Sequence, residues 1–270
     1  MKHILITNDD GVRSLGLLAL KQALEPLARV TVIAPDSNRS AIGRGITISR
    51  PLHIEEVLLR DGSPAFATDG TPVDCVRFAV LGLAGEVPDA IISGINLGTN
   101  LGDDVTYSGT VAAALEGVVL GLPAMAVSAG TLDPTRDQWD DTSYDFGPVA
   151  GFAARLAPAL LEKRTPPGVI LNVNAPGLPA TRITGARTTR LGRRVYNDRL
   201  ELLGEEGARR RYAIYGTLPS YRREPGTDFS AMEDGAISVT PIHFDLTDAA
   251  GIDALDELGL PEPSEEGPRP

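Results

Sequence analysis

The feature that most constrains the fold is a repeated alternation of short apolar runs with longer segments of helical periodicity. Residues 2–7 form an apolar, β-branched run that ends in the polar turn Asn8–Gly11, and leucines at helical spacing follow over 16–28. A second apolar run, 29–34, is stopped by Pro35. A strand, a helix and a strand with short connections predict a βαβ unit with parallel strands and a right-handed crossover.

The same alternation continues to about residue 180. Extended pieces over 46–69 predict a hairpin excursion. Further strands are expected at 89–93, 124–128 and 169–173, and further helices at 71–83, 110–120 and 147–163. Pro158 predicts a kink or a break in the last helix. The pattern predicts an α/β fold with a Rossmann-like, doubly wound and mostly parallel sheet.

The pattern changes after residue 180. Residues 181–257 hold β-type pieces without βα alternation, so we expect a β-rich C-terminal extension beside a 1–180 α/β catalytic core. These pieces need a sheet edge or another chain to satisfy their backbone groups. Residues 258–270 are rich in Pro and Glu and predict a disordered tail.

Charge and composition argue against several classes of protein. With 25 basic and 36 acidic residues the chain has a net charge of −11, so no stable binding to nucleic acid or to an anionic membrane is expected. The arginines of 182–223 are interpreted as a solvated arm paired with the protein's own acidic surface, rather than as a nucleic-acid patch. The single Cys75 excludes an internal disulfide, and no apolar run suits a signal peptide or a membrane span. A cytoplasmic protein is expected.

Four polar clusters follow predicted strands or open a helix, where ligands bind in open α/β sheets. They are residues 8–11, 36–40, 93–96 and 107–110. Asp9 and Asp10 repel each other unless a cation or a shared proton neutralises them, although the pair alone is typical of a turn. With Ser40 and Asn96 the pair makes an all-oxygen set that suits Mg²⁺ or Mn²⁺ and does not suit zinc.

The segment that follows Asn96 allows a structural and a functional interpretation. The Gly- and Asn-rich residues 96–104 form either an ordinary loop or a backbone cradle for an oxyanion. Ser108–Thr110 provides either a helix N-cap or a phosphate site at the positive end of the helix dipole. Glycine-rich dinucleotide and P-loop motifs are absent, as is a nucleophile elbow, which argues against dehydrogenases, P-loop enzymes and α/β-hydrolases.

These motifs together resemble the SurE family, the stationary-phase survival proteins that act as 5′-nucleotidases. They run in the family's order from residue 3 to about 247. The matching pieces are Ile6–Val12, Ala34–Ser40, Gly70–Val76, Ser93–Asn96, Asn100–Asp104, Tyr107–Ala114, Gly226–Phe229 and Ser238–Pro241.

The resemblance implies a SurE-like fold and a metal-dependent phosphatase that hydrolyses nucleoside 5′-monophosphates to nucleoside and phosphate. The residues that match the family's metal ligands are Asp9, Asp10, Ser40 and Asn96, for one divalent cation per subunit. The expected catalytic residues are Asn8, Asp9 and Asp10, and the expected phosphate contacts are Asn96, Gly98, Asn100, Ser108, Gly109 and Thr110. The attacking group is either a water activated at the cation or a carboxylate of Asp9 or Asp10.

The resemblance also implies a homodimer or homotetramer, in which residues 181–257 form an oligomerisation arm that embraces a neighbouring subunit. Two alternatives share the paired acidic turn: a receiver-like module, and a nucleotide-binding regulatory module without turnover. Receiver domains usually place a Lys opposite the acids. The three lysines, Lys2, Lys21 and Lys163, do not follow a candidate active-site strand, so the enzyme remains the favoured interpretation.

Overall fold

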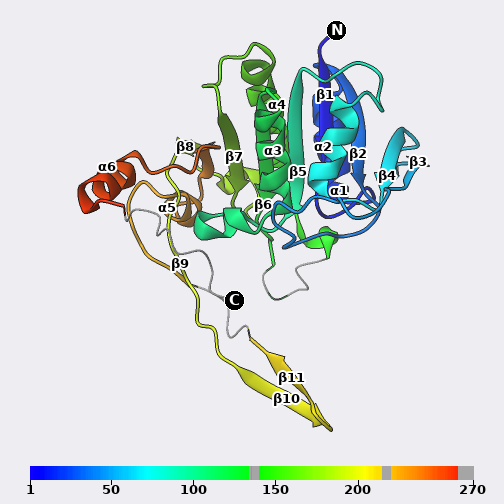
Figure 1. Cartoon of the computed structure of the whole chain (residues 1–270). Coiled ribbons are helices and arrows are strands. Elements are labelled where there is room, and N and C mark those ends of the chain that lie inside the picture. Colours follow the sequence, from blue (N-terminus) through cyan, green and yellow to red (C-terminus); the bar gives the residue numbers. More distant parts are fainter. Residues whose placement is uncertain (134, 136–139, 215–219, 261–270) are drawn as a thin grey trace.

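A nine-stranded sheet forms the centre of the molecule (Figure 1). The computed structural model describes residues 1–133, 135, 140–214 and 220–260 of the chain. The strands of the sheet are β1 (His3–Thr7), β2 (Arg29–Pro35), β3 (Ile54–Leu58), β4 (Pro64–Thr68), β5 (Ala90–Leu97), β6 (Ala124–Ala129), β7 (Val169–Ala175), β8 (Ala186–Thr188) and β13 (Ile237–His243). Their order is β3-β4-β2-β1-β5-β6-β7-β13-β8.

The sheet is mostly parallel and doubly wound, as predicted. Strands β4, β2, β1, β5, β6 and β7 run parallel, whereas β3 is antiparallel to β4 and β13 is antiparallel to β7. The chain moves outward from β1 through β2 on one side and from β5 through β6 and β7 on the other. The strand order therefore reverses between β1 and β5, which is where such sheets bind ligands.

Four helices cover the two faces of the sheet. Helices α1 (Leu15–Leu24) and α4 (Gly147–Leu161) pack on one face, and α2 (Pro72–Val80) and α3 (Gly109–Val119) pack on the other (Figure 1). The central strand β1 shows the resulting two-sided core. Ile4 and Ile6 join one apolar cluster and Leu5 joins the other, and all three are fully buried.

Local signals set most helix ends, and packing sets the rest. Thr71 caps α2 in a capping box, because its hydroxyl accepts from the backbone N–H of Asp74 while the Asp74 side chain accepts from the backbone N–H of Thr71. Helix α1 ends at Leu24, earlier than predicted, because Pro26 has no N–H to continue the helix. Of the two outcomes predicted at Pro158, the break is wrong, because α4 continues through it to Leu161 with its last turn packed in the core, whereas the kink stays a prediction.

The chain beyond residue 180 contributes to the sheet and also leaves it. Strands β8 and β13 extend the central sheet. The other elements are η1 (Gly102–Thr106), η2 (Asp141–Ser143) and η3 (Ala180–Arg182), β9 (Arg194–Val195), β10 (Glu201–Glu206), β11 (Arg209–Ala213), β12 (Ser220–Tyr221), α5 (Asp228–Glu233) and α6 (Ala249–Leu258). Helices α5 and α6 were not predicted. Most of the predicted disordered tail, 258–270, lies outside the described residues.

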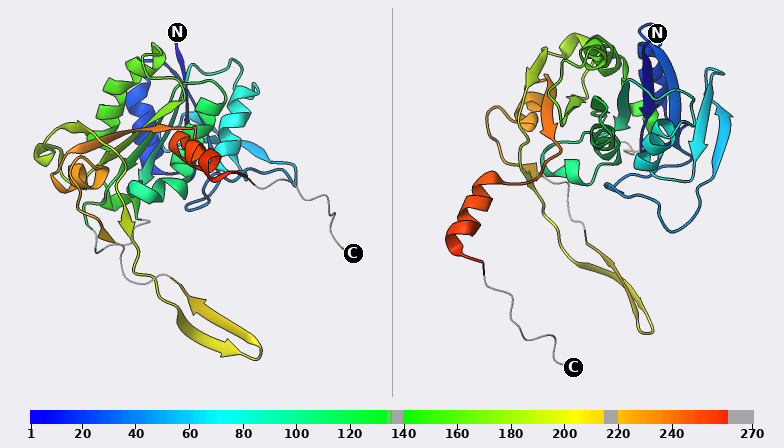
Figure 2. Two further views of the ribbon diagram at one scale, coloured as in Figure 1. Left: turned by 60° about the vertical axis from the view of Figure 1, so that its left-hand side comes forward. Right: turned by 45° about the horizontal axis from the view of Figure 1, so that its top comes forward.

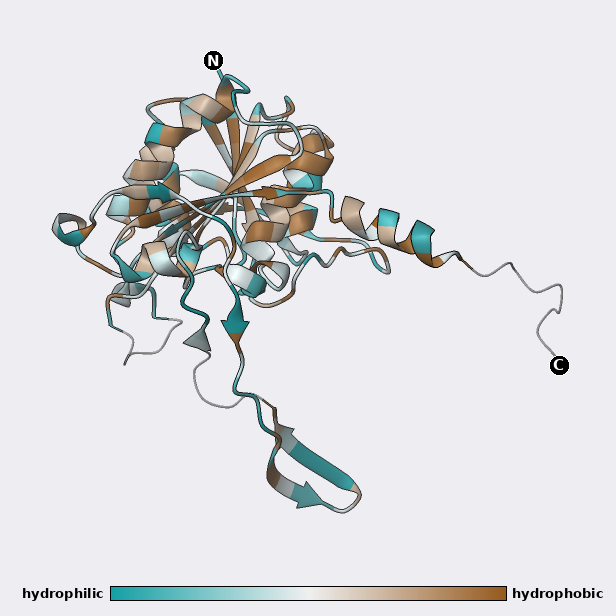
Figure 3. Cartoon of the chain, turned by 90° about the vertical axis from the view of Figure 1, so that its left-hand side faces the viewer, coloured by the Kyte–Doolittle hydropathy of each residue, from teal (hydrophilic) through white to brown (hydrophobic). Residues whose placement is uncertain are grey.

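Two elements project from the body of the molecule. The β10–β11 hairpin and α6 both extend away from the central sheet (Figure 2). The strands of the sheet are largely apolar, whereas the hairpin is largely polar with apolar positions along it (Figure 3).

Within the ranges that the structure describes, no helix is both long and apolar enough to cross a membrane.

Two helical glycines provide a test of the packing between α1 and β5. A Cβ on Gly16 would lie 2.2 Å from the backbone oxygen of Ile95, whereas a Cβ on Gly151 in α4 would meet only the flexible end of Arg155 at 3.7 Å. We expect Gly16→Ala to lower the free energy of unfolding by about 1–3 kcal/mol, because the helix must move off the sheet. The matched change Gly151→Ala should raise it by up to ~1 kcal/mol through helix propensity. Urea unfolding measures both, and equal effects would contradict this account.

Candidate functional site

The carboxyl ends of β1, β2 and β5 meet the amino end of α3 at the point where the strand order reverses. The turn 8–11 follows β1, and the segment that carries Ser40 follows β2. The backbone N–H of Arg39 donates to the carbonyl of Asp9 at 2.7 Å, which holds this segment against the acidic turn. Asn96 lies near the end of β5, which runs four residues further than predicted.

Asp9 is buried against the first turn of α3. The Thr110 hydroxyl donates to Asp9 Oδ1 at 2.5 Å, and the Thr110 backbone N–H donates to Oδ2 at 3.1 Å. A Cβ at position 109 would lie 2.8 Å from the Cβ of Asp9, so only glycine allows this approach. Burial raises the pKa of Asp9, while the hydrogen bond from Thr110 opposes the rise. The positive end of α3 therefore faces this carboxyl group.

Asp10 has only one of its two carboxyl oxygens hydrogen-bonded. Its Oδ2 accepts from the backbone N–H of Leu97 at 2.9 Å. Its Oδ1 is buried and has no hydrogen-bond partner among the residues that the structure describes. Burial and then the charge of Asp9 raise the pKa of Asp10. A buried oxygen without a donor beside a second carboxylate is an arrangement that a cation would satisfy.

Asn8 shapes the acidic turn. Its side-chain amide donates to the carbonyl of Gly11 at 3.0 Å, and its Oδ1 accepts from the Gly11 backbone N–H at 3.2 Å. The residue is fully buried. Both ends of the amide are thus engaged within the turn, so Asn8 fixes the geometry of the two acids that follow it.

The two neutral residues of the predicted cation set differ in how they are held. Asn96 is buried, and its amide donates to the carbonyl of Gly98 at 2.8 Å while its Oδ1 lies 3.4 Å from the Thr110 hydroxyl. Ser40 is half-buried in the segment after β2, with its backbone N–H bonded to the side chain of Asn38. The oxygen of Asn96 and the carboxyl group of Asp9 therefore share one hydroxyl donor.

The loop predicted to cradle an oxyanion is anchored from behind by the sheet. The Asn100 backbone N–H donates to Asn174 Oδ1 at 2.8 Å, and its carbonyl accepts from the amides of Asn172 and Asn174. Its side chain donates to Ser128 at 2.9 Å, and the N–H of Gly98 donates to Ala129. These donors are engaged within the chain, so phosphate contacts at Gly98 and Asn100 stay predictions.

The predicted phosphate donors of α3 face other partners here. The Ser108 hydroxyl caps the helix by accepting from the Val111 N–H at 3.1 Å. The N–H and hydroxyl of Thr110 face Asp9, and Gly109 packs against the same side chain. The structure brings these residues to the acidic pair, and their role toward a phosphate stays a prediction.

Three features of the site were not predicted from the sequence. The Leu97 N–H that bonds Asp10 depends on where β5 ends, and no side chain signals it. Asp141, from η2, adds a negative charge that raises the pKa of Asp10 further. The pair Asn172 and Asn174 did carry a signal, since two amides spaced two apart in an apolar strand must find buried partners.

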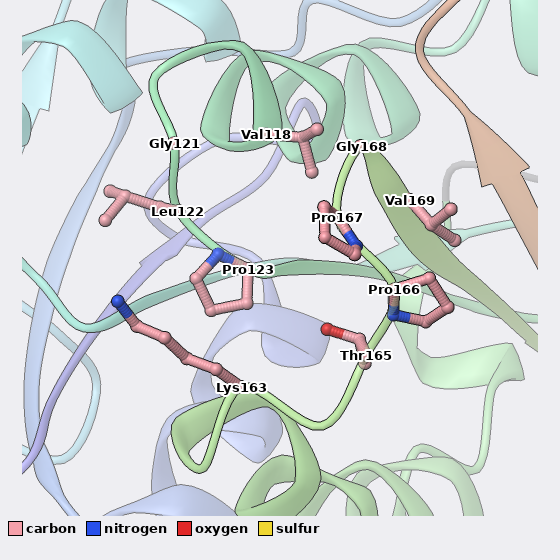
Figure 4. Close-up of a pocket in the computed structure, with 10 residues that line it drawn as sticks. All are labelled: Val118, Gly121, Leu122, Pro123, Lys163, Thr165, Pro166, Pro167, Gly168 and Val169. Carbon is pink, nitrogen blue, oxygen red and sulfur yellow. The ribbon is translucent and has the colours of Figure 1, made fainter.

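A pocket at the other end of the sheet is separate from this site. It has a cavity volume of about 360 Å³ and lies at the amino ends of β6 and β7 (Figure 4). Its lining residues are Val118, Gly121, Leu122, Pro123, Lys163, Thr165, Pro166, Pro167, Gly168 and Val169. None of the predicted site residues lines it.

The fold and the site define a doubly wound α/β protein with an oxygen-rich, acidic centre at the switch point of its sheet. The family model described as Survival protein SurE matches residues 4–198. The chain belongs to the SurE family, and the resemblance inferred from the motifs is confirmed.

Named relatives agree over nearly the whole chain. The 5′-nucleotidase SurE of Rubrobacter xylanophilus is 51% identical over 259 residues, covering 96% of this chain and 97% of the relative. That of Herpetosiphon aurantiacus is 46% identical, covering 94% and 96%. The crystal structure of the SurE protein from Aquifex aeolicus matches with a TM-score of 0.78 and 36% identity, over 95% of this chain and 99% of that one. The SurE-like fold class is thereby confirmed.

The buried acidic pair makes stability depend on pH in metal-free buffer. Because the pKa of Asp10 is raised above 3.8, the folded state binds more protons than the unfolded state, and stability falls as pH rises above that value. Asp10→Asn removes this loss. Between pH 5 and 8 we expect the variant to gain stability relative to the unsubstituted protein, by up to ~1.4 kcal/mol per pH unit. Urea unfolding in EDTA measures the difference, and a difference that does not change with pH would contradict the prediction.

Proposed function

We propose that this chain is a metal-dependent phosphatase that hydrolyses nucleoside 5′-monophosphates to nucleoside and phosphate. The observation that carries the proposal is the pair of carboxyl groups at the switch point of a SurE-family sheet, where Asp9 is buried and Asp10 is half-buried with its Oδ1 out of contact with solvent. The relatives named 5′-nucleotidase SurE support the choice of substrate.

The residues present fit a divalent cation. Asp10 Oδ1 is buried and accepts no hydrogen bond from any residue in the described ranges, and burial disfavours the charged form of both acids. In the described part of the chain no three His, Cys, Asp or Glu side chains gather as a metal-binding group, so neutral oxygens must complete the set. We assign one Mg²⁺ or Mn²⁺ per subunit to Asp9, Asp10, Ser40 and Asn96. When bound, the cation polarises a phosphoryl oxygen and lowers the pKa of water.

The chain's own residues orient this centre. Asn8 holds the turn that carries both acids through its two hydrogen bonds with Gly11. Thr110 fixes Asp9 by donating to both of its carboxyl oxygens, which leaves the carboxyl group no freedom to rotate. The anchored loop 96–100 borders the same space and would contact the phosphate. We therefore treat Asn8 and Thr110 as positioning residues, and Asp9 and Asp10 as the catalytic pair.

Loss of either acid should abolish the activity. We expect Asp9→Asn and Asp10→Asn to lower phosphate release from AMP by at least about a hundredfold, since each removes a charge from the cation site. Asp256→Asn, the same change on the exposed helix α6, should leave the rate unchanged. A colorimetric phosphate assay with added Mn²⁺ measures all three. Wild-type turnover in either site variant would contradict the assignment.

The same assay separates the enzyme from its alternatives. The enzyme releases phosphate from AMP and stops when EDTA removes the metal. A receiver-like or regulatory module binds without sustained release. Phosphate release that persists in excess EDTA would contradict the dependence on a metal, but not the phosphatase activity.

We propose further that the chain is a homodimer or homotetramer held together by its C-terminal extension. The β10–β11 hairpin projects from the body of the molecule (Figure 2), and a two-stranded hairpin alone has little stability in water. It exposes Leu202, Leu203 and Tyr212 by 41–50%. A second copy of the chain would cover these side chains and complete the backbone hydrogen bonding of the hairpin.

A charge on the hairpin should disrupt this association. We expect Leu203→Glu to weaken the oligomer, because it places an uncompensated charge in the interface. Leu58→Glu introduces the same change at an exposed position of β3 and should leave the oligomer intact. Light scattering at micromolar concentration measures the mass. A wild-type mass of 28.5 kDa would contradict the proposal.

A further inference from the structure

The segment 37–47, which carries Ser40, lies outside any helix or strand and depends on specific contacts for its position. Backbone hydrogen bonds tie it to neighbouring elements. The N–H of Arg39 bonds the carbonyl of Asp9, and the N–H of Gly43 bonds the carbonyl of Tyr107 at 2.9 Å. Gly45 accepts from the Thr71 hydroxyl at 2.8 Å. Side chains hold it as well, because the Thr47 hydroxyl donates to the buried carboxylate of Asp74 at 2.7 Å and the Arg39 guanidinium donates to the carbonyls of Asp69 and Gly70.

The Arg44 side chain connects the segment to helix α3. Its guanidinium forms an ion pair with Glu116 at 2.8 Å, and the Glu116 side chain is only 1% exposed. Glu116 belongs to α3, the helix whose first turn holds Asp9 through Thr110. One helix therefore fixes both the acidic turn and the segment that carries Ser40.

The Arg44 side chain also contacts an aromatic ring. Its guanidinium carbon lies 4.7 Å from the centre of the Phe244 ring, at a distance typical of a cation–π contact. Phe244 directly follows β13, and its backbone N–H donates to the carbonyl of Gly168 at 2.9 Å. This bond ties the Phe244 backbone to the start of β7. Arg44 therefore contacts both a buried carboxylate and an aromatic ring.

We propose that Arg44 is a positioning residue for the cation site, acting by fixing the segment that presents Ser40. The inference rests on the proposed function. Without Arg44 the segment keeps its backbone contacts and the side-chain bonds of Thr47 and Arg39, but it loses its ion pair with α3. More of the ordering of the Ser40 hydroxyl then has to occur when the metal binds. That ordering costs free energy and weakens the binding of the metal.

Arg77 provides a matched control on the same carboxylate. It pairs with the other oxygen of Glu116 at 2.6 Å but belongs to α2 and does not touch the segment 37–47. Because Arg77 remains, Arg44→Ala does not leave the buried charge of Glu116 unpaired, and the protein should fold. Arg77→Ala likewise leaves Arg44 in place. Circular dichroism verifies that both variants fold.

The experiment measures the dissociation constant for Mn²⁺ itself, from the electron paramagnetic resonance signal of the free ion, and then AMP hydrolysis. We expect Arg44→Ala to raise the dissociation constant about tenfold, the low end of the range for residues that orient a metal ligand. The activity should return at saturating Mn²⁺, so that kcat is preserved. Arg44→Lys should recover part of the affinity, and Arg77→Ala should leave it unchanged.

A double substitution tests whether the effect passes through Ser40. In a Ser40→Ala background, Arg44→Ala should weaken Mn²⁺ binding little further, because coupled residues are not additive. Additive effects of the two substitutions on the dissociation constant for Mn²⁺, or an equal loss of affinity in Arg77→Ala, would overturn the inference. Neither result would contradict the proposed phosphatase activity. A wild-type protein that binds no Mn²⁺ and releases no phosphate would instead overturn the proposed function, and this inference with it.

Discussion

The hydrogen bonds between Asp9 and the first turn of α3 are the constraint on which the site depends. They join a turn after the first strand to a helix that begins about a hundred residues later. Gly109 makes the approach possible, since any side chain there would collide with Asp9. A buried carboxyl group normally destabilises a fold, and here a hydroxyl, a backbone N–H and a helix dipole offset part of that cost. Asp10 is less well compensated, because its Oδ1 accepts no hydrogen bond from the residues that the structure describes.

The helix that holds Asp9 also organises the surroundings of the site. Its first turn faces the acidic pair, and its later turn carries Glu116, which receives Arg44 from the segment after β2. A rigid helix thus relates two segments that approach the centre from different strands. Precise geometry at the centre then depends on long-range packing rather than on the stiffness of each loop.

Much of the fold and the location of the site could be predicted from the sequence. Apolar periodicity predicts the alternation of strands and helices. Because ligands bind at the carboxyl ends of parallel strands, the sequence also predicts that Asp9, Asp10 and Asn96 lie close together. The partners of each polar group could not be predicted, because they depend on register between distant segments. The predicted phosphate donor Thr110 faces Asp9 for this reason, and β5 extends beyond its apolar run because β6 pairs with it as far as Leu97. The failed break at Pro158 shows packing prevailing over a local signal.

The hydrogen bonds that Asn172 and Asn174 form with Asn100 have a consequence for folding during synthesis. The residues proposed to hold the cation all lie within the first 96 positions, but the side chain of Asn174 that bonds the Asn100 N–H lies 74 residues further along the chain. A chain growing from the ribosome therefore presents its acidic pair well before β7 has been synthesised. The loop beside that pair takes its final shape only when the seventh strand enters the sheet, so the site matures late in synthesis although its ligands appear early.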